Sequence, residues 1–590
     1  MAKKTKKKSS APAIPDLPMG DARPRELIVI AKADAGIRAT PAGVASVTDA
    51  NCAPLQKLVT DNQITLTPLF GNEETVLKEV AESTPAAGTE AESKLHLFYH
   101  VEAPDADLEA LQEKLLANDL IEGAYIKPHG EPPVAPDLQP GEVSEVPGAE
   151  DVPAFPGNFT ARQGYLDAAP GGIDARYAWT LSGGRGRGVR IIDLEWGWRL
   201  NHVDLRQNQS GIAAGTLSTN LRSVNHGTAV LGVYSADHNS FGVSGICPDA
   251  QASVVSFSLP WATAVRRAAD RLRPGDIMLL EIHAAGPRFN YQRRNDQRGY
   301  IPIEFWPDSY EAIRYAVNKG VIVVSAAGNG AENLDDALYD ARPTGFPSWW
   351  RNPFRRGTND SGSIIVGAGA PPPGTHGRNN GADRSRLGFS NYGAAVDAQG
   401  WGREVTTAGY GDLFVDSDDR NNQDRWFTDR FSGTSSASPI VVGALGSVQG
   451  YLKARNRIPL TPSRARQLLR TTGSPQQDQP GRPRTQRIGN RPNLRQMIRS
   501  VARNNSWCGR QFTNRLEGNQ TKRFFTFRWP AHWHVAWTVM PTTPRRGAPQ
   551  IDCHVEVERS DDRYITYWII AKNLTNQPVN IEGRYCVLGW

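Results

Sequence analysis

The spacing of apolar and polar residues along the first 130 positions is typical of a small α/β unit. Strand-like runs occupy residues 25–32, 63–70, 94–104 and 121–128. Amphipathic helical patterns occupy residues 53–62 and 106–119. Strands alternate apolar residues with period two, and helices repeat them with a period near 3.6. The resulting order βαββαβ predicts a ferredoxin-like α+β unit over residues 25–128.

The pattern changes after residue 158. Short β-branched runs occur at 188–195, 252–259, 276–283, 320–328 and 363–370, and helical patterns at 228–236, 309–319 and 438–452. Strands that alternate with helices predict a mostly parallel sheet covered on both faces, here over residues 158–505. Residues 506–590 contain only strand-like runs and turns, which predicts a small all-β, sandwich-like domain.

Two segments lack any apolar periodicity. Residues 1–24 form a polar, lysine-rich stretch that predicts a disordered basic tail. Residues 129–157 are rich in proline, glycine and acids, and such a composition predicts an extended linker.

Composition narrows the class of protein. A chain of 590 residues with 39% apolar and 22% charged residues is typical of a globular protein with about three or four domains. No apolar run is long enough for a membrane span, so no membrane partner is expected. The formal charge of +6 comes largely from the N-terminal lysines, and we expect no nucleic-acid partner.

The N-terminal sequence and the cysteines indicate the cellular compartment. The basic start lacks a following apolar stretch and therefore does not predict a secretory signal. We expect a cytoplasmic protein, with export by a route that the sequence does not show as the alternative. The 5 cysteines are not spaced as a zinc site. Cys508, Cys553 and Cys586 lie near the C-terminus, and one disulfide bridge among them remains open if the protein is exported.

The segment 431–448, FSGTSSASPIVVGALGSV, places small hydroxyl residues before a buried helical pattern. One interpretation is capping, because serine and threonine accept hydrogen bonds from the N–H groups at a helix start. The other is a nucleophile, because a serine at a helix N-terminus lies at the positive end of the helix dipole. The segment alone favours capping.

Three further segments carry chemistry. Asp193 ends an apolar strand, where parallel sheets gather their ligands; a helix cap is the alternative. His226 precedes a helix of small residues, and a structural role is the alternative. Asn329 stands between two glycines after a buried strand, which by itself indicates only a turn.

Together these residues supply the parts of an acyl-transfer site. A serine needs a base to take its proton, and the base needs an anion that holds its tautomer. The tetrahedral intermediate needs a donor directed at its oxyanion. Asp193, His226, Asn329 and Ser435 provide these groups within one predicted α/β domain.

The motifs NHGTAVLG, SAAGNG and SGTSSASP, in this order, resemble those of the subtilisin-like serine proteases (subtilases, peptidase family S8). The resemblance covers about 160–500. It implies a subtilisin-like three-layer fold and a serine endopeptidase with Asp193 as orienting acid, His226 as general base, Ser435 as nucleophile and Asn329 as oxyanion donor. The strand at 276–286 resembles the family's substrate-pairing strand, which implies that His283, Ala284, Ala285 and Gly286 bind the polypeptide substrate. No cofactor is implied.

The unit at 25–128 resembles the family's propeptide, which assists folding and then inhibits. Its end, IKPHGEPPVAP, is predicted to lie along the cleft as an added strand. We therefore expect a zymogen that cleaves itself between Lys127 and Arg162, and a 25–128 fragment that inhibits the mature enzyme.

Three features depart from the family pattern or stay open. The family follows its aspartate with a small hydroxyl residue and glycine, whereas Leu194 and Glu195 follow Asp193. Glu195 either brings a second negative charge to His226 and raises its pKa, or points into solvent. Glu281 is either a satisfied buried acid or a group that directs the cleft toward cationic residues. The acidic run 416–424 suits structural calcium, with a solvated insertion as the favoured alternative.

Two rival functions remain. A sedolisin-like acid peptidase uses a similar serine turn with glutamate and aspartate but lacks the histidine. An inactive, protease-like binding scaffold is the other. The aromatic residues of RWPAHWHVAW, 528–537, are expected to form core rather than a sugar site.

Overall fold

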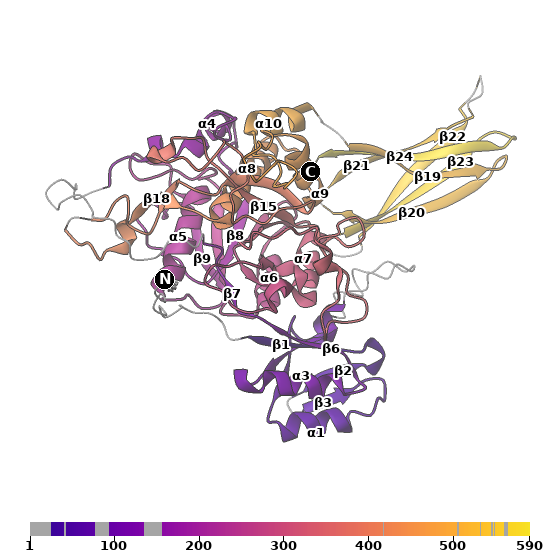
Figure 1. Ribbon diagram of the computed structural model, residues 1–590. Coiled ribbons are helices and arrows are strands. Elements are labelled where there is room, and N and C mark those ends of the chain that lie inside the picture. Colours follow the sequence, from indigo (N-terminus) through magenta and orange to yellow (C-terminus); the bar gives the residue numbers. More distant parts are fainter. Residues whose placement is uncertain are drawn as a thin grey trace, which may run out of the picture.

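The computed structural model describes residues 25–40, 43–76, 94–134, 156–416, 418–503, 507–531, 533–543, 547, 549–559 and 564–589. The predicted tail 1–24 and most of the predicted linker lie outside these residues. Three units are visible, a lower α+β unit, a central α/β body and a projecting β unit (Figure 1). Among the helices of the described segments, none combines the length and the hydropathy that a membrane crossing requires.

The N-terminal unit is a four-stranded antiparallel sheet with two helices on one face. In chain order its elements are β1 (Glu26–Ala31), α1 (Ala53–Asp61), β4 (Thr65–Pro68), β5 (Phe98–Glu102), α3 (Leu108–Leu116) and β6 (Ile121–Lys127). The sheet order β4-β5-β1-β6 is that of a ferredoxin-like split βαβ unit. The predicted α+β class is therefore confirmed, and a hairpin of β2 (Ile37–Thr40) and β3 (Gly43–Ser46) is added to it.

The central body is built on a seven-stranded sheet in the order β16-β15-β14-β11-β8-β10-β9. The strands are β8 (Arg190–Glu195), β9 (Gln209–Ala214), β10 (Gln251–Ser256), β11 (Ile277–Leu280), β14 (Ile322–Ala326), β15 (Ile364–Gly369) and β16 (Val396–Trp401). All neighbouring pairs are parallel, as predicted. The strands are apolar on both sides because both faces of the sheet are covered.

Helices cover the two faces of this sheet and form two hydrophobic cores. One core lies under α4 (Ala175–Trp179), α5 (Leu221–Ser235), α8 (Thr434–Lys453), α9 (Pro462–Thr471) and α10 (Leu494–Arg503). The other lies under α6 (Trp261–Arg271) and α7 (Pro307–Asn318). Consecutive residues of one strand point to opposite faces of the sheet: Ile191 packs in the first core and Ile192 in the second. This confirms the predicted three-layer α/β domain.

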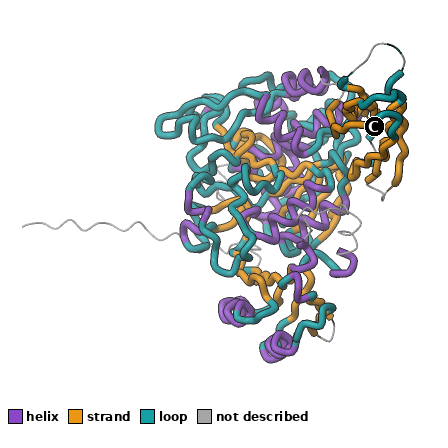
Figure 2. The backbone as a smooth tube through the Cα atoms, turned by 90° about the vertical axis from the view of Figure 1, so that its right-hand side faces the viewer, coloured by secondary structure: helices purple, strands orange, loops and turns teal. Residues whose placement is uncertain are grey.

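The N-terminal unit docks through the free face of its sheet. Figure 2 shows its strands toward the body and its two helices turned away. Ile28, Ile30, Phe98 and Tyr125 of this sheet belong to the same apolar cluster as α6 and α7. The two units thus share one continuous core, which fixes where residues after Lys127 enter the body.

A buried ion cluster completes this junction. Lys127 Nζ lies 2.6 Å from Asp308 Oδ2 and 2.7 Å from Glu26 Oε2. Tyr125 donates to the other Asp308 oxygen at 2.9 Å, and the Lys127 ammonium lies 4.4 Å from the centre of a Trp261 ring. Asp308 stands in the first turn of α7, where the helix dipole favours a negative charge.

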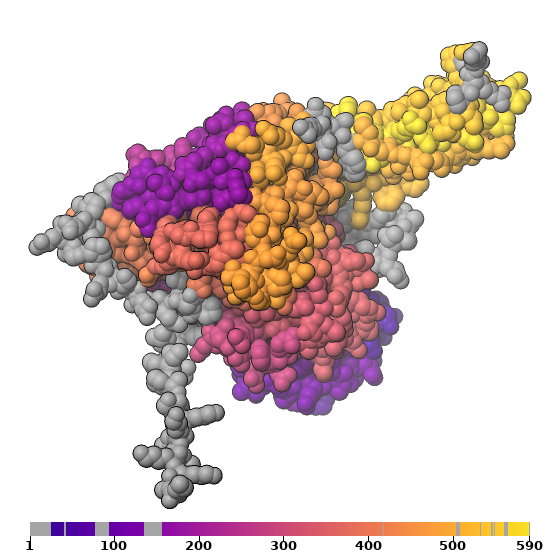
Figure 3. Space-filling view, turned by 45° about the horizontal axis from the view of Figure 1, so that its top comes forward, coloured from indigo at the N-terminus to yellow at the C-terminus, as the bar shows by residue number. Residues whose placement is uncertain are grey.

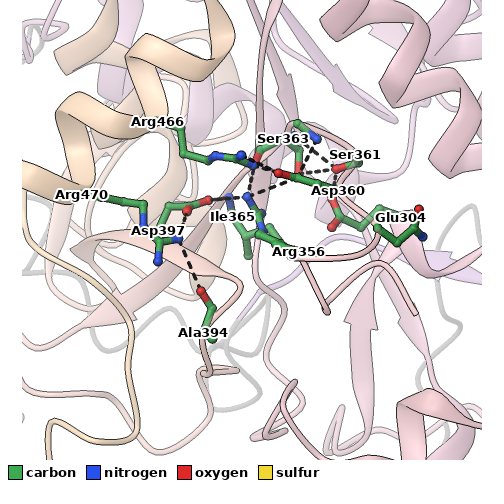
Figure 4. A network of polar contacts seen from close by, with 12 residues as sticks. Glu304, Arg356, Asp360, Ser361, Ser363, Ile365, Ala394, Asp397, Arg466 and Arg470 are labelled. Atoms are coloured by element: carbon green, nitrogen blue, oxygen red, sulfur yellow. Dashed lines mark hydrogen bonds and ion pairs between the residues drawn. The ribbon is translucent and has the colours of Figure 1, made fainter. Parts of the chain in front are cut away.

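A second polar network fastens α9 to the far edge of the sheet (Figure 4). Asp397 of β16 is fully buried and binds Arg470 at 2.7 Å and Arg356 at 3.2 Å. The same carboxylate accepts the Ile365 N–H at 3.1 Å. Arg466 pairs with Asp360 in the adjoining loop. Each buried charge therefore has an opposite charge beside it.

The C-terminal unit consists of two three-stranded antiparallel sheets and projects from the body (Figure 3). Its strands are β19 (Trp507–Leu516), β20 (Thr521–Pro530), β21 (His534–Pro541), β22 (Ile551–Arg559), β23 (Tyr564–Asn573) and β24 (Val579–Gly589). The rings of Trp529 and Trp537 pack 5.2 Å apart around the core of this unit, as predicted for the aromatic run. Cys508 and Cys586 form a disulfide bond.

Candidate active site

The candidate site lies where strands end and helices begin on one side of the central sheet. Glu195 is the last residue of β8, and Asn329 follows β14 by three positions. Ser435 is the second residue of α8, so this helix begins earlier than the predicted 438. His226 lies inside α5, which begins at Leu221, rather than before it. Parallel α/β sheets gather polar groups at this edge.

The structure brings the predicted base and the predicted nucleophile together. His226 Nε2 lies 2.8 Å from Ser435 Oγ, although 209 positions separate the two residues in the chain. Both side chains are fully buried. The His226 ring is held from the side by Phe431, whose ring centre is 5.6 Å away. This distance allows direct transfer of a proton between the two side chains.

The structure corrects the predicted orienting acid. Glu195 Oε2, and not Asp193, lies 2.5 Å from His226 Nδ1. Asp193 instead accepts the indole N–H of Trp198 at 2.8 Å. Both carboxylates point to the same side of β8, as residues two apart on a strand must. Only Glu195, at the very end of the strand, reaches the imidazole, so the alternative that it points into solvent is wrong.

The sequence carries one signal that points to Glu195 and not to Asp193. The family pattern has glycine two positions after its acid, and Gly197 stands two positions after Glu195. A Cβ atom added to Gly197 would lie 3.0 Å from Ser218 O and 3.0 Å from Val224 Cγ2, so a side chain has little room at this position. A Cβ atom added to Gly227 would lie 2.3 Å from Gly197 O, so α5 packs directly on the chain that leaves β8. This close approach brings His226 to Glu195.

Three buried acids lie behind the imidazole. Burial, and then the charge of Glu195, raises the pKa of Asp193 and of Glu281 well above the ordinary values. Burial also raises the pKa of Glu195. Carboxylates that interact this closely are not all ionised together. Since only Glu195 contacts an imidazole, we infer that the negative charge resides there and that the other two are neutral.

The covered site favours a neutral imidazole. Burial, and then the positive charge of Arg222, lowers the pKa of His226 to about 3. A neutral imidazole has one ring nitrogen that accepts a proton and one that donates. With the Nδ1 hydrogen directed at Glu195, Nε2 is free to accept a proton from Ser435. This protonation state is the one that a general base requires.

Asn329 lies beside the start of α8. Its Oδ1 accepts from the Thr434 N–H at 3.0 Å and from the Thr434 hydroxyl at 3.1 Å. Its Nδ2 donates to Gln297 at 3.1 Å, so one of its two amide hydrogens is directed away from Ser435. The predicted oxyanion donor therefore contacts Thr434, the residue just before Ser435 in the chain. It retains a second amide hydrogen for a ligand.

The predicted substrate strand pairs with a segment of the chain itself. β12 (His283–Ala285) lies antiparallel to β7 (Gly130–Glu131), with His283 opposite Glu131 and Ala284 opposite Gly130. On its other side β12 pairs with β13 (Tyr300–Pro302), and the Gly286 N–H donates to Gly299 O at 2.8 Å.

The same segment reaches the nucleophile. Ser435 Oγ lies 2.8 Å from the Pro133 carbonyl oxygen, and its single hydrogen serves either this oxygen or His226 Nε2. The space beside β12 and Ser435 is thus occupied from Gly130 to Pro133, and residues 135–155 lie outside the described residues.

The structure also shows the surroundings of Glu281 and of the acidic run. Glu281 accepts a hydrogen bond from Ser438 inside the fold and is fully buried, so it is a structural acid and does not direct the cleft toward cations. In the acidic run, Asp416 pairs with Arg425 and Asp424 with Arg199. Among the described residues no cluster of three or more metal-binding side chains is found.

The sequence of the chain is similar to those of known proteins. The profile of the Subtilase family, Peptidase_S8, matches residues 186–490. The intracellular serine protease of Paenibacillus polymyxa is 24% identical over 322 residues, which span 51% of this chain and 78% of that protein. Thermitase of Thermoactinomyces vulgaris is 24% identical over 312 residues, or 51% of this chain and 86% of that protein. The crystal structure of fervidolysin from Fervidobacterium pennivorans aligns with a TM-score of 0.45 at 16% identity, and covers 96% of this chain and 70% of that one.

Proposed function

The chain belongs to the subtilase family, and from this premise we propose that it is a serine endopeptidase whose catalytic residues are Ser435, His226 and Glu195. The contact of 2.8 Å between His226 Nε2 and Ser435 Oγ carries this proposal. A glutamate replaces the aspartate that the family pattern has at the orienting position. Its longer side chain starts from the last residue of β8 and reaches Nδ1 directly.

The proposed reaction begins with attack on a peptide carbonyl. Ser435 Oγ forms a bond to the carbonyl carbon while His226 Nε2 takes the hydroxyl proton. Glu195 accepts the Nδ1 hydrogen bond, keeps the ring in the required tautomer and stabilises the imidazolium that forms. Water is excluded from these groups by burial, which strengthens their electrostatic interaction.

The remaining steps return every group to its starting state. The backbone N–H of Ser435, in the first turn of α8, and the second amide hydrogen of Asn329 would hold the oxyanion. The imidazolium gives its proton to the leaving amine, which leaves an acyl-enzyme. A water molecule then attacks the acyl carbon while His226 Nε2 takes its proton, and the imidazolium returns this proton to Ser435 Oγ as the bond between Oγ and the acyl carbon breaks. Side chains and backbone supply all of this chemistry, and the proposal requires no cofactor.

We further propose that residues 25–134 act as an intramolecular inhibitor. The pairing of β7 with β12 and the contact of Ser435 Oγ with the Pro133 carbonyl oxygen support this, because a polypeptide substrate would need the same space. The carbonyl at the nucleophile belongs to Pro133. Self-cleavage, expected between Lys127 and Arg162, would therefore fall at the Pro133–Val134 bond.

The rival functions fit these observations less well. A sedolisin-like site has no histidine at the serine, whereas here His226 is the group beside Ser435. A binding scaffold would not need the acid, base and alcohol to lie within hydrogen-bond distance of one another. The alignment of Glu195, His226 and Ser435 therefore favours the peptidase.

The experiment uses the full chain, casein and a fluorophosphonate that labels reactive serines. We expect hydrolysis of casein and, after digestion, the label on Ser435. Ser435→Ala should abolish both and should leave the chain uncut, whereas the wild-type chain should yield a product that begins at Val134. Hydrolysis that persists in Ser435→Ala, or a label on another serine, would contradict the proposal.

A further inference from the structure

The segment in the cleft shows how a polypeptide is aligned with the nucleophile. Ser435 contacts the Pro133 carbonyl, so Pro133 stands where a substrate has its last residue before the scissile bond, the P1 position. Counting back, Pro132 stands at P2, Glu131 at P3 and Gly130 at P4. The last two are the residues that pair with β12. The residues around Glu131 and Gly130 therefore show which side chains the protein accepts at P3 and at P4.

The carboxylate of Glu131 is bound by two donors from the catalytic body. Tyr300 Oη donates to Glu131 Oε1 at 2.7 Å, and Arg293 Nε donates to the same oxygen at 3.1 Å. Only 8% of Glu131 is exposed, which is low for a glutamate. A buried carboxylate needs such charged and polar partners, because burial without them costs free energy.

Neighbours in the catalytic body set the orientation of the Tyr300 hydroxyl. The Tyr300 oxygen accepts the Arg294 N–H at 3.1 Å, which turns its own hydrogen toward Glu131. The ring of Tyr300 packs on His283, 4.8 Å from centre to centre. The neighbouring cation, Arg294, is already paired with Asp296 at 2.6 Å. Arg293 is thus the cation that faces the P3 carboxylate, and lysine at P3 would meet repulsion.

The P4 position excludes side chains. A Cβ atom added to Gly130 would lie 2.6 Å from Ile282 Cδ1 and 2.8 Å from Trp261 Cζ2. Both residues are 1% exposed, and Trp261 packs edge-on against Trp306 at 5.7 Å. Side chains held this tightly do not move aside without strain.

From these contacts we propose that the cleft selects polypeptides with glycine at P4 and an acidic residue at P3, and that Tyr300, Arg293 and Trp261 determine this selectivity. The proposal rests on the proposed peptidase function and names its substrate class. The inhibitory segment, Gly130–Glu131, carries the same two residues and therefore binds as a substrate does.

The first test loosens the segment in the full chain. Gly130→Ala and Glu131→Gln should each raise the initial rate of casein hydrolysis about tenfold, because the first adds a clash with Ile282 and Trp261 and the second removes the charge that Arg293 and Tyr300 bind. Gly157→Ala and Glu113→Gln are the matched controls. A Cβ at Gly157 would have only Phe159 at 3.9 Å, and Glu113 is exposed on α3. We expect both controls to keep the wild-type rate.

The second test measures recognition in trans with capped peptides of residues 128–136, Pro-His-Gly-Glu-Pro-Pro-Val-Ala-Pro. They compete with casein for the Gly130→Ala chain. Replacing glutamate by glutamine should raise the inhibition constant about tenfold, and lysine should raise it further. Replacing glycine by leucine should also raise it at least tenfold. Equal inhibition by the glutamate and lysine peptides would contradict the proposed preference for an acidic residue at P3. Equal inhibition by the glycine and leucine peptides would contradict the proposed requirement for glycine at P4.

The third test assigns the pocket to its residues. Tyr300→Phe and Arg293→Ala should each reduce the preference for the glutamate peptide over the glutamine peptide, while Arg298→Ala, an exposed arginine of the same loop, should keep it. Preference unchanged in both pocket variants would contradict the assignment. If casein is hydrolysed but no peptide preference appears, the selectivity proposal fails and the peptidase proposal stands. If no chain hydrolyses casein and Ser435 is not labelled, the peptidase proposal itself fails.

Discussion

At the scale of single residues, the position of an acid along β8 decides whether its side chain contacts His226. Asp193 and Glu195 lie on one face of β8, yet only Glu195 contacts His226, at 2.5 Å. Asp193 is instead engaged by the Trp198 indole. Position at the strand end, more than residue type, therefore selects the acid that holds the imidazole.

A pair of isosteric substitutions tests this selection. Glu195→Gln should lower kcat by about a thousandfold or more, because the imidazolium loses its charge partner, while Asp193→Asn should change it less than about tenfold. Loss of the negative charge also lowers the pKa of His226. Since catalysis needs the neutral ring, the acid limb of the kcat/KM profile should move to lower pH in Glu195→Gln. Initial rates from pH 4 to pH 9 measure both effects.

A larger loss of kcat in Asp193→Asn than in Glu195→Gln would mean that Asp193, and not Glu195, orients the imidazole. An acid limb that stays in place in Glu195→Gln would mean that Glu195 carries no negative charge beside the ring.

At the scale of elements, α8 carries Ser435, the proposed nucleophile, and is almost entirely buried. Its small residues let other segments approach its backbone closely. A Cβ atom added to Gly443 would lie 2.5 Å from Ile246 Cβ, and one added to Gly446 would lie 2.7 Å from Cys247 Sγ. The glycines of this buried helix thus determine how closely neighbouring segments pack against its backbone.

Gly443→Ala should therefore destabilise the protein in spite of helix propensity. In an open helix this change would gain about 1 kcal/mol. Here the added methyl group clashes with a buried isoleucine, and overpacking costs about 1–3 kcal/mol. Thermal unfolding should show a lower midpoint than wild type. A raised midpoint would mean that Ile246 relaxes without strain.

The network around Asp397 permits a second test at this scale. Asp397→Ala removes the buried carboxylate from Arg470 and from the Ile365 N–H, while Arg356 keeps Asp360 at 3.7 Å, and loss of such charged hydrogen bonds costs about 1.5–3 kcal/mol. We expect a lower unfolding midpoint and earlier proteolytic cleavage near α9. Asp478→Ala, an exposed acid whose side chain is 61% accessible, is the control and should leave the midpoint unchanged.

At the scale of the whole molecule, the N-terminal unit and the catalytic body share one apolar core and one buried ion cluster. Lys127 stands three residues before the strand that fills the cleft. The cluster therefore sets where the segment enters the cleft, and docking of the unit and coverage of Ser435 are coupled through the chain itself.

Lys127→Ala should weaken this coupling. It leaves Asp308 and Glu26 buried without their cation, which costs about 3–5 kcal/mol, and the cost falls on the docked state. We expect faster labelling of Ser435 by the fluorophosphonate and a lower unfolding midpoint. Lys57→Ala, on the exposed surface of α1, should change neither. Labelling at the wild-type rate would show that the apolar contacts alone hold the unit.

Sequence by itself determined the elements and most of the chemistry. Period-two and period-3.6 patterns predicted the α+β unit, the parallel sheet and the β unit, because burial imposes these periods on any chain. The motifs around His226, Asn329 and Ser435 predicted three residues that the structure places close together, since each motif is local.

Only the tertiary structure decided the rest. Whether Asp193 or Glu195 meets the imidazole depends on how closely α5 packs on the end of β8, at Gly227 and Gly197. The pocket for Glu131 joins Tyr300, Arg293 and a segment more than 160 residues away in the chain, as the 169-residue separation of its hydrogen bond shows. Contacts of this kind are set by packing between distant segments, and no local pattern records them.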